Sequence, residues 1–107
     1  MILSDKNVKC ELNDNVMTAF IKGEVDHHNA KAIRSKIDDD LYSHHPKELI
    51  LDLSGVNFMD SSGLGLILGR YTKATDLGIG FKVQHPTPAT LKILDLAGTG
   101  RIITIEK

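Results

Sequence analysis

One apolar run, residues 49–53 with the sequence LILDL, constrains the fold of this chain most strongly. A strand with one face in water alternates apolar and polar residues, and this run does not. Near-continuous apolar runs are typical of strands that are buried on both faces, as in parallel sheets covered by helices. The chain is therefore predicted to fold as an α/β domain that contains such a buried strand.

Turn residues and apolar spacing predict the other elements. An Asn-Asp-Asn turn at 13–15 joins two short strands into a hairpin, and the stretch 23–26 ends the second of them. Strands joined through helices run parallel, so the order β-β-α-β-α-β-α-β predicts a single domain, residues 1–107, with a mixed, mainly parallel sheet and helices packed on it. The predicted strands are 7–12, 16–21, 49–53, 79–84 and 102–105, and the predicted helices lie between 26 and 46, from about 62 to 77, and from 87 to 98.

Helical spacing gives each helix a core side. Asp26 or Asn29 is the candidate cap of the first helix. In the second helix Gly65 and Gly69 fall on the outer side, near Leu66. The residues predicted to face the core are Ala30, Ile33, Ile37 and Leu41 in the first helix, Leu64, Ile67, Leu68 and Tyr71 in the second, and Leu91 and Leu94 with Ile93 in the third.

Composition narrows the function classes. The formal net charge of −1 gives no electrostatic reason to bind nucleic acid or an anionic membrane, and without tryptophan the chain lacks a stacking platform for single strands. No apolar run approaches the roughly 20 residues of a membrane span, and the first residues lack the apolar region of a signal peptide. Cys10 is the only cysteine, which excludes an internal disulfide. We expect a cytoplasmic protein that binds neither nucleic acid nor membranes.

The predicted topology brings polar residues together at one edge of the sheet, where sites in open α/β sheets lie. Residues 60–63, Asp-Ser-Ser-Gly, stand where the second helix begins, and one of Asp60, Ser61 and Ser62 is expected to cap it. A phosphate on a serine there would suit the helix N-terminus and would change the surface charge strongly. The residues alone leave capping and regulatory phosphorylation both open. The groups at this edge are Asp26 with His27 and His28, Asp60 with Ser61, and His85 with Thr87.

The glycines of the second helix also allow two interpretations. Gly65 and Gly69, with Leu66 beside them, form a smooth outer face that favours close docking of another protein. The same glycines would equally admit a neighbouring loop of this domain.

Enzymatic and metal-binding alternatives find little support. The histidines lack the spacing of metal ligands, and no glycine-rich phosphate loop is present. A serine hydrolase would need His85 to approach Ser61 or Ser62, and the Gly-x-Ser-x-Gly elbow is absent. An Asp60 phosphoacceptor would need a cluster of acids for Mg²⁺, toward which only Asp52 could contribute. No catalytic residue, cofactor or metal site is expected.

Three blocks together resemble the STAS-domain anti-sigma factor antagonists. They are residues 59–71 (MDSSGLGLILGRY), residues 23–28 (GEVDHH), and residues 91–98 (LKILDLAG) followed by Arg-Ile-Ile at 101–103. Their order and spacing cover nearly the whole chain and are most similar to the sporulation members, the anti-sigma F factor antagonists. The resemblance implies a single STAS domain.

The resemblance also implies a partner-switching function. The unphosphorylated antagonist binds an anti-sigma factor serine kinase (SpoIIAB-like), which releases the sigma factor, here sigma F of sporulation. The kinase uses its own bound ATP to phosphorylate the antagonist on the serine after the aspartate, Ser61, and a PP2C-type phosphatase (SpoIIE-like) restores it. A monomer that is not an enzyme and needs no cofactor is expected.

The resemblance and the exposed-face argument together give a set of partner-binding residues. A paralogous antagonist of a stress-response sigma factor or signalling complex is the alternative function, and a small serine hydrolase is a remote one. The predicted partner-binding residues are Asp26, His27, Asp60, Ser61, Ser62, Gly63, Gly65, Leu66 and Gly69.

Overall fold

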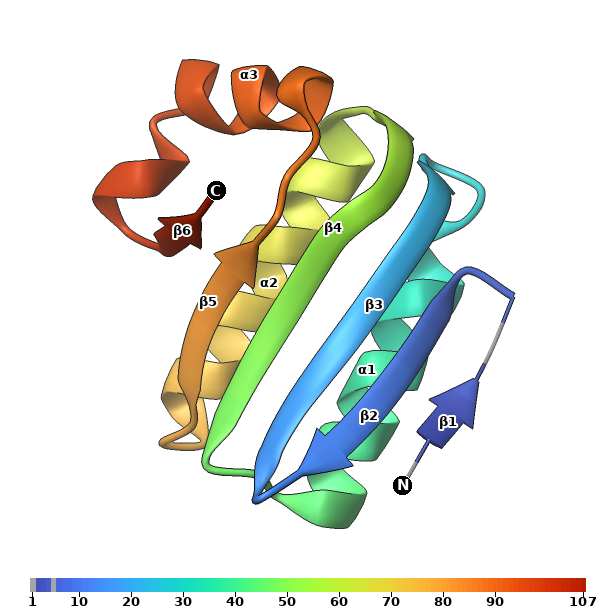
Figure 1. Cartoon of the computed structure of the whole chain (residues 1–107), viewed down its shortest axis with the longest axis vertical. Helices are drawn as coiled ribbons and strands as arrows, with labels where there is room; N and C mark the ends of the chain where they lie inside the picture. Colours follow the sequence, from blue (N-terminus) through green and yellow to red (C-terminus); the bar gives the residue numbers. More distant parts are fainter. Residues whose placement is uncertain (1, 5) are drawn as a thin grey trace.

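The computed structural model describes residues 2–4 and 6–107, so Met1 and Asp5 of the N-terminal stretch lie outside the described residues. Within that part of the chain, strands form one 6-stranded sheet in the order β1-β2-β3-β4-β5-β6 (Figure 1). The strands are β1 (Ile2–Ser4), β2 (Val8–Asn13), β3 (Val16–Val25), β4 (Glu48–Met59), β5 (Gly80–Gln84) and β6 (Thr104–Glu106). The helices are α1 (Ala30–His44), α2 (Ser61–Asp76), α3 (Pro88–Leu96) and the 3-10 helix η1 (Thr99–Arg101).

The mixed, mainly parallel sheet is confirmed. β2 and β3 form an antiparallel hairpin, and the turn between them places Asp14 and Asn15 at positive φ, as a two-residue hairpin turn requires. The pairs β3–β4, β4–β5 and β5–β6 are all parallel. Every residue of the run 49–53 is buried, which confirms the prediction made from its apolar sequence. The strand between Ile2 and Ser4 was not predicted.

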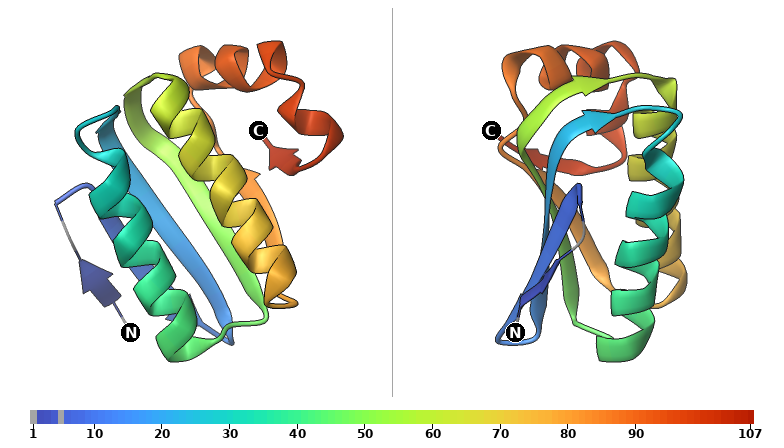
Figure 2. Two further views of the ribbon diagram at one scale, coloured as in Figure 1. Left: turned by 180° about the vertical axis from the view of Figure 1, so that it is seen from behind. Right: turned by 90° about the vertical axis from the view of Figure 1, so that its right-hand side faces the viewer.

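Two helices cover one face of the sheet. α1 packs over β2 and β3, α2 packs over β4 and β5, and the two helices lie side by side (Figure 1, Figure 2). α3 packs against β4 at the end of the sheet where β4 leads into α2. No helix within the described ranges is both long enough and apolar enough to cross a membrane. The layering places the N-terminal ends of α1 and α2 next to each other.

Two strand boundaries were predicted wrongly. β4 continues to Met59 instead of ending at 53, and β3 continues to Val25 instead of ending at 21. The pairing of β3 with β4 passes through two irregularities, and Gly23 takes a φ of +80° within β3. These bulges allow the strands to continue past polar residues and to bury Val56 and Met59.

The last strand was also placed wrongly. It spans Thr104–Glu106 instead of 102–105, and Ile102 is 58% exposed. Gly98 takes a left-handed conformation after α3 and leads into the single turn of η1. Because this turn lies between α3 and β6, the last strand begins two residues later than predicted, at Thr104 instead of 102.

The core side of α1 is confirmed and that of α2 needs correction. Ile33, Ile37 and Leu41 are buried as predicted, whereas Ala30 is only half-buried. In α2 Leu66 is 5% exposed, although the helical spacing placed it on the outer side with the glycines. The reason is that α2 packs against α1 as well as against the sheet, which widens its buried arc. The buried residues of α2 are Gly63, Leu66, Ile67, Arg70 and Ala74, while Leu64, Leu68 and Tyr71 are partly buried against the core.

Candidate functional site

The first turn of α2 is capped by Asp60. Its backbone is extended, and its carboxylate Oδ1 accepts hydrogen bonds from the backbone N–H groups of Ser62 (2.8 Å) and Gly63 (3.3 Å). Ser61 is exposed, and its hydroxyl makes no hydrogen bond with any residue that the structure describes. Because Asp60 does the capping, the Ser61 hydroxyl is available to solvent and to a partner.

The three glycines of α2 have different surroundings. A Cβ at Gly63 would lie 2.8 Å from the carbonyl oxygen of Val25 and would overlap Cγ of Met59. Gly63 is thus buried against the ends of β3 and β4, where only a glycine fits. A Cβ at Gly65 or Gly69 would meet no atom within 4 Å. No loop among residues 2–4 and 6–107 packs there, which contradicts the alternative that these two glycines admit one.

The loop before α1 is fixed by its own polar groups. Oδ1 of Asp26 accepts hydrogen bonds from the backbone N–H groups of His28 (3.0 Å) and Asn29 (3.1 Å). Asn29 occupies the N-cap position without a side-chain cap bond, and its amide donates to the Glu24 carbonyl (2.9 Å). Asp26 therefore supplies the side-chain hydrogen bonds before α1, whereas Asn29 occupies the N-cap position. They hold His27 and His28 exposed at the edge of the sheet.

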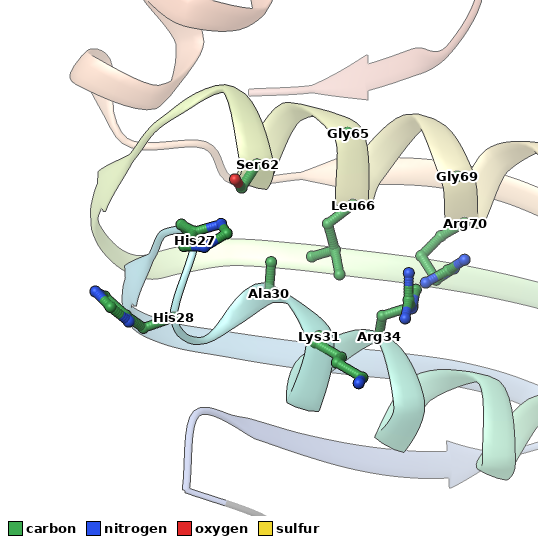
Figure 3. A pocket seen from close by; sticks show the side chains of 10 residues that line it. All are labelled: His27, His28, Ala30, Lys31, Arg34, Ser62, Gly65, Leu66, Gly69 and Arg70. Carbon is green, nitrogen blue, oxygen red and sulfur yellow. The ribbon is translucent and has the colours of Figure 1, made fainter.

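A groove of about 660 Å³ lies between the N-terminal halves of α1 and α2 (Figure 3). It brings together several of the predicted residues, with Leu66 reaching from α2 toward α1 and Ser62 at one end near His27. Asp26, Asp60, Ser61 and Gly63 are not among its lining residues. The lining residues are His27, His28, Ala30, Lys31, Arg34, Ser62, Gly65, Leu66, Gly69 and Arg70.

Sequence reasoning missed the two arginines of this groove. The Arg70 side chain is 6% exposed, and its Nε lies 3.1 Å from Oδ1 of Asp38. Burial lowers the pKa of Arg70, and the positive charge of Arg34 lowers it further, whereas Asp38 opposes both. Arg70 follows Leu66 by four residues, so the burial of Leu66 would have placed Arg70 on the same side. Arg34 has no comparable signal in the sequence.

A second polar cluster surrounds Asp52 on β4, away from the groove. The Asp52 carboxylate accepts hydrogen bonds from the Ser54 backbone (2.9 Å), the Ser54 hydroxyl (2.6 Å) and the Gln84 amide (2.9 Å), and it lies 3.0 Å from Nδ1 of His85. His85, which holds a φ of +54°, therefore pairs with Asp52 and not with Ser61 or Ser62. The hydrolase arrangement considered from the sequence is not formed.

The same contacts make Asp52 sensitive to acid. Burial alone would raise the pKa of Asp52, but hydrogen bonds from Ser54, His85 and Gln84 outweigh it and lower the pKa. A carboxyl group with a lowered pKa stabilises the fold fully above its unfolded-state pKa, and that contribution disappears as the pH falls through the folded-state pKa.

Asp52→Asn is expected to lower the free energy of unfolding by about 1 kcal/mol near neutral pH, because the amide cannot accept all of these hydrogen bonds. Urea unfolding of both proteins from about pH 7 to about pH 3 measures the difference, which should shrink toward the acid end. A difference that is constant over this range would contradict the assignment of a charged, hydrogen-bonded Asp52.

Comparison with known proteins agrees with this fold. Residues 7–107 match the family model of the STAS domain. The chain is 33% identical to the anti-sigma F factor antagonist of Paenibacillus polymyxa, over 92% of this chain and 84% of that protein. It is 28% identical to the anti-sigma-B factor antagonist of Bacillus subtilis (strain 168), over 94% and 90% of the two chains.

Solved structures give the same assignment. The unphosphorylated form of the anti-sigma factor antagonist SpoIIAA superimposes with a TM-score of 0.79 at 27% identity, over 94% of this chain and 88% of that chain. The phosphorylated form of SpoIIAA, a Bacillus cell fate determinant, gives a TM-score of 0.72 at the same 27% identity, over 94% and 91% of the two chains. The fold, the capped start of α2 and these relatives lead to one conclusion: the chain belongs to the STAS-domain family of anti-sigma factor antagonists.

Proposed function

We propose that this chain controls sigma F of sporulation by binding an anti-sigma factor that is also a serine kinase, and that phosphorylation of Ser61 switches this binding off. Binding of the unphosphorylated chain would displace the sigma factor from the kinase. The protein would act as a binding module and kinase substrate without catalysis of its own.

The observation that supports this most directly is the position of Ser61. It is exposed in the first turn of α2, and the capping bonds of that turn are made by Asp60. A kinase can therefore reach the hydroxyl without opening the fold. The exposed backbone at Gly65 lies on the same helix and offers a surface for close docking.

Phosphorylation would act through charge and not through unfolding. A phosphate carries about −1.5 to −2 charges at neutral pH. At Ser61 it would stand next to the Asp60 carboxylate, which already uses the N–H groups of Ser62 and Gly63. Docking would have to remove both charges from water, which opposes association.

In this phosphorylation cycle, the ATP and the enzymes that add and remove the phosphate come from partner proteins. The kinase supplies the ATP, so this chain needs no cofactor, and a PP2C-type phosphatase would remove the phosphate. A chain that binds such a kinase and releases its sigma factor would act in the cytoplasm, and this is the location that we propose.

The proposal is tested by intact-mass spectrometry and peptide mapping after incubation with the anti-sigma factor kinase of the same organism and ATP. We expect one added phosphate, located on Ser61, that Ser61→Ala abolishes. Ser43→Ala is the matched control, because it removes an exposed serine hydroxyl near the end of α1, outside the groove, and should leave the phosphate in place. A phosphate on another residue, or none with a kinase shown to be active, would contradict the proposal.

A stress-response sigma factor is the second candidate target. The 28% identity to an anti-sigma-B factor antagonist supports it, although the anti-sigma F factor antagonist of Paenibacillus polymyxa is more similar, at 33%. Competition experiments distinguish the two candidate targets. This chain is added to each anti-sigma factor kinase already bound to its own sigma factor, and the release of the sigma factor is measured. Release of the stress-response sigma factor alone would favour the second candidate.

A further inference from the structure

The groove between α1 and α2 carries positive charge that the described residues do not fully balance. Within the described part of the chain, its lining includes Lys31, Arg34 and Arg70 but no aspartate or glutamate. Figure 3 shows the guanidinium groups of Arg34 and Arg70 next to each other, whereas Lys31 turns away from α2. Asp38, which pairs with Arg70, leaves this arginine pair with a net charge of about +1.

Arg70 is buried without its full set of hydrogen bonds. Its side chain is 6% exposed, and its Nη1 has no hydrogen-bond partner within the described part of the chain. Its contact with Asp38 through Nε brings the atoms to 3.1 Å but does not have hydrogen-bond geometry. Buried guanidinium groups usually have hydrogen-bond partners for their N–H groups. The unpartnered N–H groups of Arg70 would therefore be stabilised by a ligand that accepts hydrogen bonds.

The glycines make this position reachable for another protein. The side of α2 at Gly65 and Gly69 is open, and both residues line the groove. The backbone of a partner can therefore approach α2 closely enough for a short side chain to enter. Ser62 and Arg70 are separated by two turns of helix, roughly 12 Å along its axis.

We propose that this groove receives the carboxylate of an aspartate or glutamate side chain of the anti-sigma factor kinase, held by Arg34 and Arg70. This rests on the proposed function and adds the chemistry by which the partner is recognised. A single carboxylate matches the net charge of the arginine pair with Asp38, and a guanidinium group binds carboxylates in a planar, two-bond geometry. A phosphate dianion would exceed that charge.

The test is the affinity of Arg34→Glu for the kinase, measured by calorimetric titration. Arg34 is exposed, so the variant should fold, and thermal unfolding followed by circular dichroism checks this. We expect affinity to fall about tenfold or more, because a carboxylate would then face a carboxylate. Lys47→Glu is the control with the same change of charge, at an exposed site before β4 at the opposite end of the sheet, and should change affinity less than about twofold.

A charge swap identifies the occupant. Acidic residues of the kinase are replaced one at a time by lysine, and one such variant should restore binding of Arg34→Glu. Affinity of Arg34→Glu equal to that of Lys47→Glu, or a loss that no acidic residue restores, would overturn the inference while leaving the proposed function intact. A wild-type chain that neither binds the kinase nor is phosphorylated by it would overturn both.

Discussion

Gly63→Ala is expected to lower the free energy of unfolding by about 2 kcal/mol, although alanine is the better helix former. The added methyl group would overlap Cγ of Met59 and lie 2.8 Å from the carbonyl oxygen of Val25. Met59 is 5% exposed and Val25 ends β3, so the surrounding core resists displacement. This strain should outweigh the roughly 1 kcal/mol that alanine gains over glycine inside a helix. Urea unfolding followed by circular dichroism measures the change.

Gly65→Ala is the matched control two residues along the same helix. Its methyl group would meet no atom within 4 Å, so the free energy of unfolding should rise by up to about 1 kcal/mol. The two variants thus differ in sign for the same chemical change. If both stabilised the protein, the close packing of α2 against the ends of β3 and β4 would be contradicted.

The order of the elements could be predicted because its signals are local. The Asn-Asp-Asn turn already contains the two residues that take positive φ, Asp14 and Asn15. Thr87 caps α3 by accepting a hydrogen bond from the Thr90 backbone, and Pro88 lies in the first turn, where proline is favoured. The sequence allowed Asp60, Ser61 or Ser62 to cap α2. The hydrogen bonds in the structure assign this role to Asp60.

The lengths of the central strands could not be predicted in the same way. The second half of β4 contains Ser54, Gly55 and Asn57, which weaken any strand signal. That half is held by pairing with β3 across two register shifts, an interaction between residues far apart in sequence. At the end of the chain, the apolar Ile102 suggested a strand, but it is exposed because η1 precedes β6.

The arginines that line the groove could not be predicted from the sequence either, because their positions depend on contacts between distant segments. A helical wheel assigns one buried side, whereas α2 contacts both the sheet and α1 and so buries Leu66 and Arg70 as well. Arg34 is an ordinary exposed residue of α1 when read from the sequence. Its role in the groove depends on Arg70, which follows it by 36 positions in the sequence. The folded chain brings the two side chains together, Arg34 from α1 and Arg70 from α2.

Ser61→Asp is expected to weaken binding to the anti-sigma factor kinase about 100-fold, whereas Ser61→Ala should bind within about threefold of the wild type. The new carboxylate would lie beside that of Asp60, which already occupies the N–H groups of Ser62 and Gly63. These donors cannot neutralise a second charge, and docking would remove both carboxylates from water. Calorimetric titration of the three proteins with the kinase gives the affinities.

The loss of binding should not come from a loss of structure. An acidic side chain in the first turn of a helix is favourable, so the free energy of unfolding of Ser61→Asp should equal or slightly exceed that of the wild type. Ser43→Asp adds the same charge at an exposed position near the end of α1 and should leave affinity nearly unchanged. Equal affinities of Ser61→Asp and Ser61→Ala would show that charge at this position does not control docking, and the switch would then need another physical basis.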